Sequence, residues 1–337
     1  MDRSSASSYV YAKASGMLAR SYVGPRTEKL FSVHTLSELW ALLFDDEVPA
    51  VPEMFLAKQI EEKALNRFLN QYIKLVNSYS KPDEVLITLL ESYDFDNLKL
   101  MAASLTVGGE KPFIRNIQPY SIINYDAYPD IAKITAGSIL SWYNKVPGVH
   151  EQRELDTKLD IQFVRRLWAS VEKLSASERK PVEELIALVY SIRNVIWAMR
   201  LKVFYKMPAE EIKKRLAFVN TENPKDDIIA SDAFAILNKS VDSWDDWENW
   251  KYAEFLNPHE DVNVWNLDPL WVEAKTSRYF YDKALKDFHR YQSSSMVLVT
   301  WFYIKMNELH YIRTAVEAIR LNADENQVRE IAGMKEA

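Results

Sequence analysis

The chain has 337 residues, of which 48% are hydrophobic, and this is enough apolar material for one large core or several smaller ones. Only seven glycines are present, which disfavours sheet-rich folds and phosphate-cradling loops, because both need residues at positive φ. The absence of cysteine excludes disulfides and Cys-ligated metal sites, and a net charge of −6 with interspersed signs argues against a nucleic-acid-binding face.

In the first third of the chain we expect helices at 8–22, 36–44, 52–78 and 83–106. Between residues 65 and 76 the apolar side chains recur at three- and four-residue steps, the period of a helix that buries one face. Pro82 marks a restart, and Gly108 and Gly109 end the fourth helix. The proline-rich stretch 111–129 predicts an irregular connection.

The remaining two thirds repeat this alternation of short and long helices. We expect short helices at 130–133 and 137–143, long ones at 151–174 and 181–206, and a short one after Pro208. A polar break at 221–227 leads to an aromatic-rich helix over 230–255, and then to long helices at 270–291 and 295–321. Asn322 and Glu325 form a capping-box-like start for a last helix that ends near Gly333.

Neither a signal peptide nor a membrane span is expected. Residues 1–9 are polar, and the longest apolar run, 296–304, is far shorter than the ~20 residues that cross a bilayer. We therefore expect a soluble protein with no direct membrane span.

The three long helix pairs can be laid over one another as an internal repeat. In each first helix an acid precedes a phenylalanine by seven residues, as Glu61, Asp156 and Glu273 show. Each second helix carries a four-residue signature, which reads Asp94-x-x-Asn97, Ser191-x-x-Asn194 and Glu308-x-x-Tyr311 in the three repeats. In the third repeat Arg313 follows two positions after Tyr311. These buried-looking polar positions lie mid-helix, where Asp and Asn are disfavoured, so we expect them to bond other helices or a partner, or to face water.

The repeat predicts an all-α fold of three similar helical-hairpin domains, arranged with pseudo-threefold symmetry in a funnel shape. Domain boundaries are expected at 1–115, 116–210 and 211–337, with the terminal helices packed together.

No motif of a known catalytic class is present. The chain lacks the glycine-rich nucleotide motifs and G-x-S-x-G, and its five histidines do not form the H-E-x-x-H or E-x-x-H spacing of metal sites. The segment 244–250 (WDDWENW) is interpreted as core packing, with Trp244, Trp247 and Phe255 on one stripe of a helix. The three repeat acids are interpreted as solvated or ion-paired, and no cofactor, metal or catalytic residue is expected.

The signatures resemble the C subunit of bacterial and archaeal A/V-type ATPases, called subunit d in vacuolar proton pumps. Residues 9–22 (YVYAKASGMLARSY) resemble the opening helix of that family, and 36–43 (LSELWALL) its short second element. The stretch 307–333 (NELHYIRTAVEAIRLNADENQVREIAG) resembles its end most closely. The resemblance extends over essentially the whole chain.

This resemblance implies a non-catalytic rotor subunit for ATP-linked H⁺ or Na⁺ transport, located at the cytoplasmic face of the membrane. One end of the funnel would meet the membrane proteolipid (c/K) ring, and the other would form a socket for the central shaft, subunits of the D and F types. From the net charge we expect an acidic socket that attracts a basic shaft tip. The loops that end the three hairpins are candidates for one of the two interfaces, and their residues are Gly108, Gly109, Lys111, Lys206, Pro208, Asn322 and Asp324.

Two other readings stay open. A solenoid adaptor would hold its repeats in an open row with distinct caps rather than in a ring. An all-α enzyme would need clustered acids such as D-D-x-x-D, and neither Asp226–Asp227 nor Asp245–Asp246 continues into that pattern.

Overall fold

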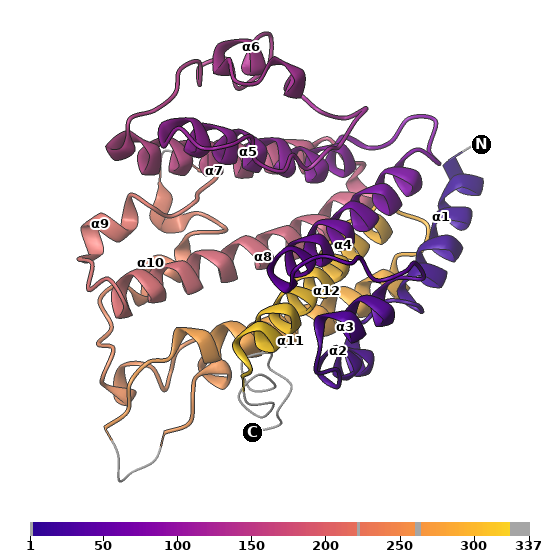
Figure 1. Ribbon diagram of the computed structural model, residues 1–337. Helices are drawn as coiled ribbons and strands as arrows, with labels where there is room; N and C mark the ends of the chain where they lie inside the picture. Colours follow the sequence, from indigo (N-terminus) through magenta and orange to yellow (C-terminus); the bar gives the residue numbers. More distant parts are fainter. Residues whose placement is uncertain (1–2, 221–222, 260–263, 324–337) are drawn as a thin grey trace.

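The computed structural model describes residues 3–220, 223–259 and 264–323, and within these ranges the regular structure is all helical (Figure 1). Six long helices form three successive pairs. Their bounds are α4 (Glu53–Val76), α5 (Glu84–Thr106), α7 (Val149–Glu172), α8 (Ala176–Val203), α11 (Pro269–Arg290) and α12 (Met296–Leu321). The all-α fold class and the long helices expected from the sequence are confirmed. The predicted start at Asn322–Glu325 of a last helix, and its end at Gly333, fall mainly outside the described residues.

The shorter helices connect or precede these pairs. They are α1 (Arg3–Leu18), α2 (Glu28–Phe31), α3 (Leu36–Leu43), α6 (Ile131–Thr135), α9 (Ala209–Lys213) and α10 (Ser231–Ile236). Local chemistry fixes several ends. The Thr35 hydroxyl accepts a hydrogen bond from the Glu38 amide at 3.1 Å, and the Glu38 carboxylate accepts one from the Thr35 amide at 3.2 Å. Together these two bonds form a capping box at the N-terminus of α3. Asn322 adopts φ 49° and ends α12 in the left-handed conformation.

Two expected helices are wrong. Residues 137–143 form turns, because Gly137 takes φ +72° and the Ser138 hydroxyl accepts from the Leu140 amide in place of a helical bond. The stretch 230–255 is helical only over α10 and two single 3₁₀ turns. There the Trp247 indole donates to the Ser240 carbonyl at 2.5 Å, so side chains satisfy backbone groups that a helix would have paired.

The turns within the three helix pairs converge at one end of the molecule, which we call the apex and define by residues 77–83, 173–175 and 291–295. The Arg3 guanidinium donates to Asp83 and also to Glu178 at 2.7 Å, and the Ser295 hydroxyl donates to Asp83. Lys173 adds an ion pair to Glu84 at 2.7 Å. The first helix of the chain therefore ties together turns that lie far apart in sequence.

From the apex the long helices fan out (Figure 1). The two helices of the first and second pairs diverge, and the closest packing joins neighbouring pairs instead: α5 lies along α7, α8 along α11, and α12 along α4, while α11 and α12 also pack on each other. The packing order thus returns from the last long helix to the first. This closed order supports the predicted pseudo-threefold ring and funnel, and both stay predictions, as do the three domain boundaries.

The hydrophobic core follows the fan. Near the apex one cluster is shared by all six long helices, and it is centred on stacked rings such as Phe68 and Trp301, whose centroids lie 5.9 Å apart. Away from the apex the core divides. The C-terminal half of α8 packs with residues 233–256, Trp265 and Leu267, where Trp247 is fully buried. The first half of α4 packs with α2, α3 and the end of α12. The expectation that Trp247 and Phe255 are core residues is confirmed, although no continuous helix carries them.

Candidate partner-binding cavity

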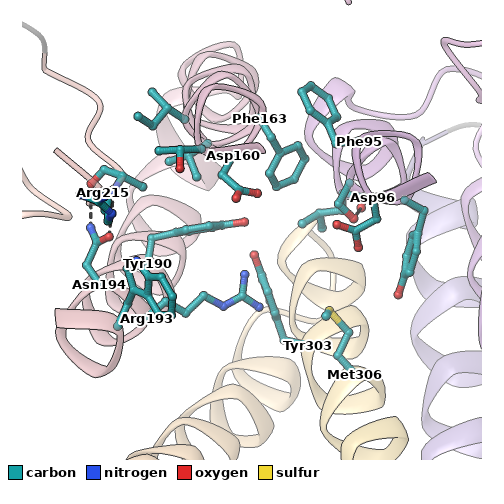
Figure 2. A pocket seen from close by; sticks show the side chains of 18 of the residues that line it. Phe95, Asp96, Asp160, Phe163, Tyr190, Arg193, Asn194, Arg215, Tyr303 and Met306 are labelled. Atoms are coloured by element: carbon teal, nitrogen blue, oxygen red, sulfur yellow. Dashed lines mark hydrogen bonds between the residues drawn. The ribbon is translucent and has the colours of Figure 1, made fainter. Parts of the chain in front are cut away.

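A cavity of about 470 Å³ lies where the helices separate, with α5 and α7 on one side and α8 and α12 on the other (Figure 2). Each helix supplies side chains from its inner face. Phe95 and Asp96 come from α5, Asp160 and Phe163 from α7, and Arg193 from α8, with Tyr190, Trp197, Tyr303 and Met306 completing most of the wall. Trp197 is 42% exposed and Asp160 and Arg193 are exposed, so solvent reaches the interior.

Aromatic rings form the apolar part of the wall. Phe95 and Phe163 meet edge to face with centroids 5.3 Å apart and join α5 to α7. On the other side Phe302 and Tyr303 belong to the buried first half of α12. Because these rings are held by the shared core, the wall is preformed by packing.

The acidic side chains of the cavity are already paired with cations. Asp96 accepts from Arg115 at 2.9 Å and lies 3.9 Å from Lys99, and Lys99 also pairs with Asp160. Burial raises the pKa of Asp96, while Lys99 and Arg115 oppose that shift. The net-charge expectation of an acidic socket is therefore not supported by this lining.

The basic side chains differ from one another. Arg215 pairs with Glu211 at 3.2 Å, whereas Arg193 forms no ion pair with any carboxylate in the described ranges. Its guanidinium lies 5.1 Å from the Tyr190 ring centre. Burial by itself would lower the pKa of Arg193, but Tyr190, Tyr303 and Asp96 together raise it above its ordinary value. Among the described residues, the cavity thus holds a permanent cation that contacts Tyr190 and feels the charge of Asp96 but forms no direct ion pair with a carboxylate.

Two signature asparagines make the same contact in successive repeats. The buried Asn97 side chain accepts from the Arg115 amide at 3.0 Å and donates to the Arg115 carbonyl at 2.8 Å. Asn194 bonds the Ala217 amide at 2.9 Å and the Ala217 carbonyl at 2.7 Å. We call this two-bond contact the asparagine clasp. In each case it fastens the segment that leaves a long helix back onto that same helix.

The acidic position of the signature has a related role. Asp94 accepts from the Ile122 amide at 2.6 Å and from the hydroxyls of Ser121 and Tyr125, so it holds the irregular connection 111–129. Burial raises the pKa of Asp94 to about 6, although these donors favour its charged form.

In the third repeat the docked segment comes from the start of the chain. Glu308 is buried, pairs with Lys305, and accepts from the Tyr22 amide at 2.7 Å, while Lys305 donates to the Ser21 hydroxyl at 2.8 Å. Tyr311 is buried on the same helix. Arg313 is exposed and pairs with Glu61 at 3.2 Å. The N-terminal segment therefore occupies, on α12, the role that the connections play on α5 and α8.

The three repeat acids are ion-paired or hydrogen-bonded and line smaller hollows beside the cavity. Glu61 bonds Arg313, Glu273 bonds Arg200, and Asp156 accepts from Gln152 at 2.8 Å. Each lines a different hollow.

The loops that end the hairpins do not form one cluster. The end of α5 reaches the start of α7, because the Thr106 hydroxyl donates to the Pro147 carbonyl at 3.0 Å. Tyr205 and Met207, on either side of Lys206, line a groove together with Val149. This groove adjoins the cavity, because Trp197 and Arg215 line both.

In the first of these loops, Gly108 takes φ +66°, the Gly109 amide donates to the Ser104 carbonyl, and the Lys111 amine lies 5.5 Å from the Tyr128 ring centre. In the second loop, Lys206 takes φ 50° and Pro208 is the N-cap residue of α9. Asn322 lines a separate hollow beside α2, and Asp324 lies outside the described residues.

Sequence reasoning missed Arg193, and a signal for it existed in the repeat register. Residues two positions after the first residue of the signature are Asp96, Arg193 and His310. Asp96 and Arg193 line the cavity, and His310 lines the adjoining hollow that Arg193 also borders. The register therefore marks the inner face of the fan in all three repeats.

Among the described residues, no helix is both long and apolar enough to span a bilayer, and no cluster of metal-ligating side chains occurs. The sequence model of the ATP synthase (C/AC39) subunit family matches residues 27–331. A protein of Treponema pallidum (strain Nichols), described as "Uncharacterized protein", is 27% identical over 345 residues, covering 99% of this chain and 98% of the relative.

Proposed function

Because the chain belongs to the ATP synthase (C/AC39) subunit family, we propose that it is the non-catalytic coupler between the rotating shaft and the membrane proteolipid ring of a V/A-type ATPase. It would carry torque between ATP turnover in the soluble head and H⁺ or Na⁺ movement in the membrane. In this role the subunit is peripheral, at the cytoplasmic face, and binds shaft subunits of the D and F types and the c/K ring.

The observation that carries this proposal, beyond family membership, is the two-ended fan. One end is closed by the Arg3 contacts to Asp83 and Glu178, and the other opens around a preformed cavity. A coupler needs two separate binding surfaces on a stiff body, and long helices that share one core near the apex supply that stiffness. We assign the cavity to the tip of the shaft, and the ring to a different surface.

The hairpin-ending loop of the second repeat supports this assignment. Tyr205 is 63% exposed beside Lys206, and it borders the groove that continues into the cavity. We propose that Lys206 and Pro208 lie at the rim of the shaft interface. For Gly108, Gly109 and Lys111 we propose a rim position near the start of α7, and Asn322 and Asp324 are proposed as a separate contact.

Purification of the complex tests the proposal. The tagged chain is recovered from detergent-solubilised native membranes, and the bound proteins are quantified by mass spectrometry. We expect proteolipid and shaft subunits in fixed ratios to the tagged chain. Excess untagged chain serves as a matched competitor and should reduce both. Recovery of neither partner would refute the coupler, and recovery of an unrelated protein in fixed ratio would favour a different adaptor.

A further inference from the structure

Arg193 is the charge in the cavity that the fold leaves without a counter-ion. Its neighbours at the equivalent repeat positions are neutralised: Asp96 is paired with Arg115, and burial lowers the pKa of His310, which favours its uncharged form. A guanidinium stays ionised at any physiological pH. Within the described residues, Arg193 therefore keeps a full positive charge that only an incoming group can pair.

The surroundings of Arg193 favour a planar anion such as a carboxylate. In Figure 2 the hydroxyl ends of Tyr190 and Tyr303 point toward one another and the Arg193 guanidinium lies beside them, and both tyrosine side chains are buried. The buried Tyr303 hydroxyl lies near Tyr190 and Arg193 but makes no hydrogen bond of good geometry, so it can reorient toward an incoming acceptor. A carboxylate can accept two parallel hydrogen bonds from one guanidinium, and such a pair is strongest where water is largely excluded.

The size of the cavity limits what can bring the carboxylate. A cavity of about 470 Å³ is far smaller than a folded domain, so it admits only a short piece of a partner, such as the terminal turn of a helix. The aromatic wall of Phe95 and Phe163 provides apolar contact for such a turn.

We propose that the cavity receives the terminal turn of a shaft helix through one of its Asp or Glu side chains, which forms an ion pair with Arg193. This inference rests on the proposed function, and it specifies the chemistry of the shaft contact. It reverses the charge pattern expected from net charge, because the socket contributes the cation and the shaft contributes the anion.

The test measures binding of the purified pair of D- and F-type shaft subunits to immobilised full-length chain. Arg193→Glu should weaken the affinity by at least ~30-fold, because the new carboxylate replaces an attraction with repulsion of the incoming carboxylate. Arg193→Lys should bind with intermediate affinity, since it keeps the charge without the planar fork. Arg290→Glu is the matched control: Arg290 also lies over a tyrosine ring, at 5.5 Å from Tyr291, but at the apex, and should bind like the parent.

Charge reversal identifies the partner residue. Each Asp and Glu in the terminal turns of the shaft is changed to Lys and tested against Arg193→Glu, and one of them should restore binding. Thermal melts of every variant check folding. If Arg193→Glu melts early, Arg193→Gln replaces it in the affinity comparison and Arg193→Asp replaces it in the charge reversal.

Three results are decisive. If the parent chain does not bind the shaft, the proposed function is wrong. If the parent binds and a folded Arg193→Glu or Arg193→Gln binds equally well, the Arg193 contact is wrong while the coupler stands. If binding falls but no shaft reversal restores it, the anion is not a shaft carboxylate and the inference is also wrong.

Discussion

Single polar residues at mid-helix positions hold the connections of this molecule in place. Asp94 and Asn97 lie on one turn of α5 and bind two points of the same irregular segment, Ile122 and Arg115. Their burial explains why the sequence retains them where helix propensity is poor, since each side chain replaces water for backbone groups that no strand or helix satisfies.

Asp94 should make the stability of the protein depend on pH. Its folded pKa of about 6 lies above the ordinary value of 3.8, so the folded state holds its proton where the unfolded state has lost it. This contribution is fully present below pH ~4 and is lost as pH rises from there to about 6. Relative to Asp94→Asn, the parent should lose on the order of 3 kcal/mol across that window.

Urea titrations at several pH values between 4 and 7.5 measure this difference. The exposed Glu248→Gln variant is the control and should track the parent. A difference between parent and Asp94→Asn that stays constant with pH would contradict the prediction.

At the scale of elements, the asparagine clasp converts irregular segments into fixed parts of the fold. Residues 111–129 have little regular structure of their own, and the same holds for residues 214–220 and 223–230. Asn97 nevertheless anchors the first of these segments to α5, and Asn194 anchors the second to α8. The clasp therefore determines which way the chain turns when it leaves one hairpin for the next.

Asn97→Ala should destabilise the protein by ~1–3 kcal/mol, because the Arg115 amide and carbonyl lose their partner in a partly buried site. Amide exchange should accelerate at Arg115 and its neighbours, and much less in α8. Hydrogen–deuterium exchange with mass spectrometry resolves the two regions. Asn249→Ala, an exposed asparagine bonded only to the adjacent Glu248, provides the comparison. Equal protection of 111–122 in both variants would rule out the clasp.

Local signals explain what the sequence could predict and what it could not. The long helices were predictable, because apolar steps such as those in 65–76 and terminators such as Gly108 act within a few residues. The helix predicted over 230–255 was wrong because side chains there bond the backbone. The Asp246 carboxylate accepts from the Ser240 amide and the Trp247 indole donates to the Ser240 carbonyl, in place of helical hydrogen bonds. Arg193 was missed because its significance depends on four helices from three hairpins meeting around it.

At the scale of the whole molecule, the start of the chain closes the fan. The buried Val10, Ala14 and Leu18 of α1 pack into the shared core, Arg3 joins two turns at the apex, and Tyr22 meets Glu308. No other segment within the described residues bonds to both the apex turns and α12 in this way.

Deletion of residues 1–26 should therefore open the fan, although the whole family match, residues 27–331, is retained. Loss of the apolar side chains of α1 should cost at least ~3 kcal/mol. Small-angle scattering should show a larger radius of gyration, and the melting temperature should fall. Arg3→Ala keeps α1 but removes exposed ion pairs worth ~0–1 kcal/mol, so it should change neither measurement appreciably. An unchanged radius in the deletion would refute this role.

The contact between Tyr22 and Glu308 also has a consequence for synthesis in the cell. The two residues are separated by 286 positions, so at translation rates of ~5–20 residues per second the ribosome needs roughly 15–60 s to reach the second after making the first. During that interval the N-terminal segment has no docking surface on α12. The nascent chain therefore emerges with the α12-facing side of its N-terminal segment uncovered, although α4 is already available to α1. A chaperone acting on this subunit should bind that uncovered side until translation is complete.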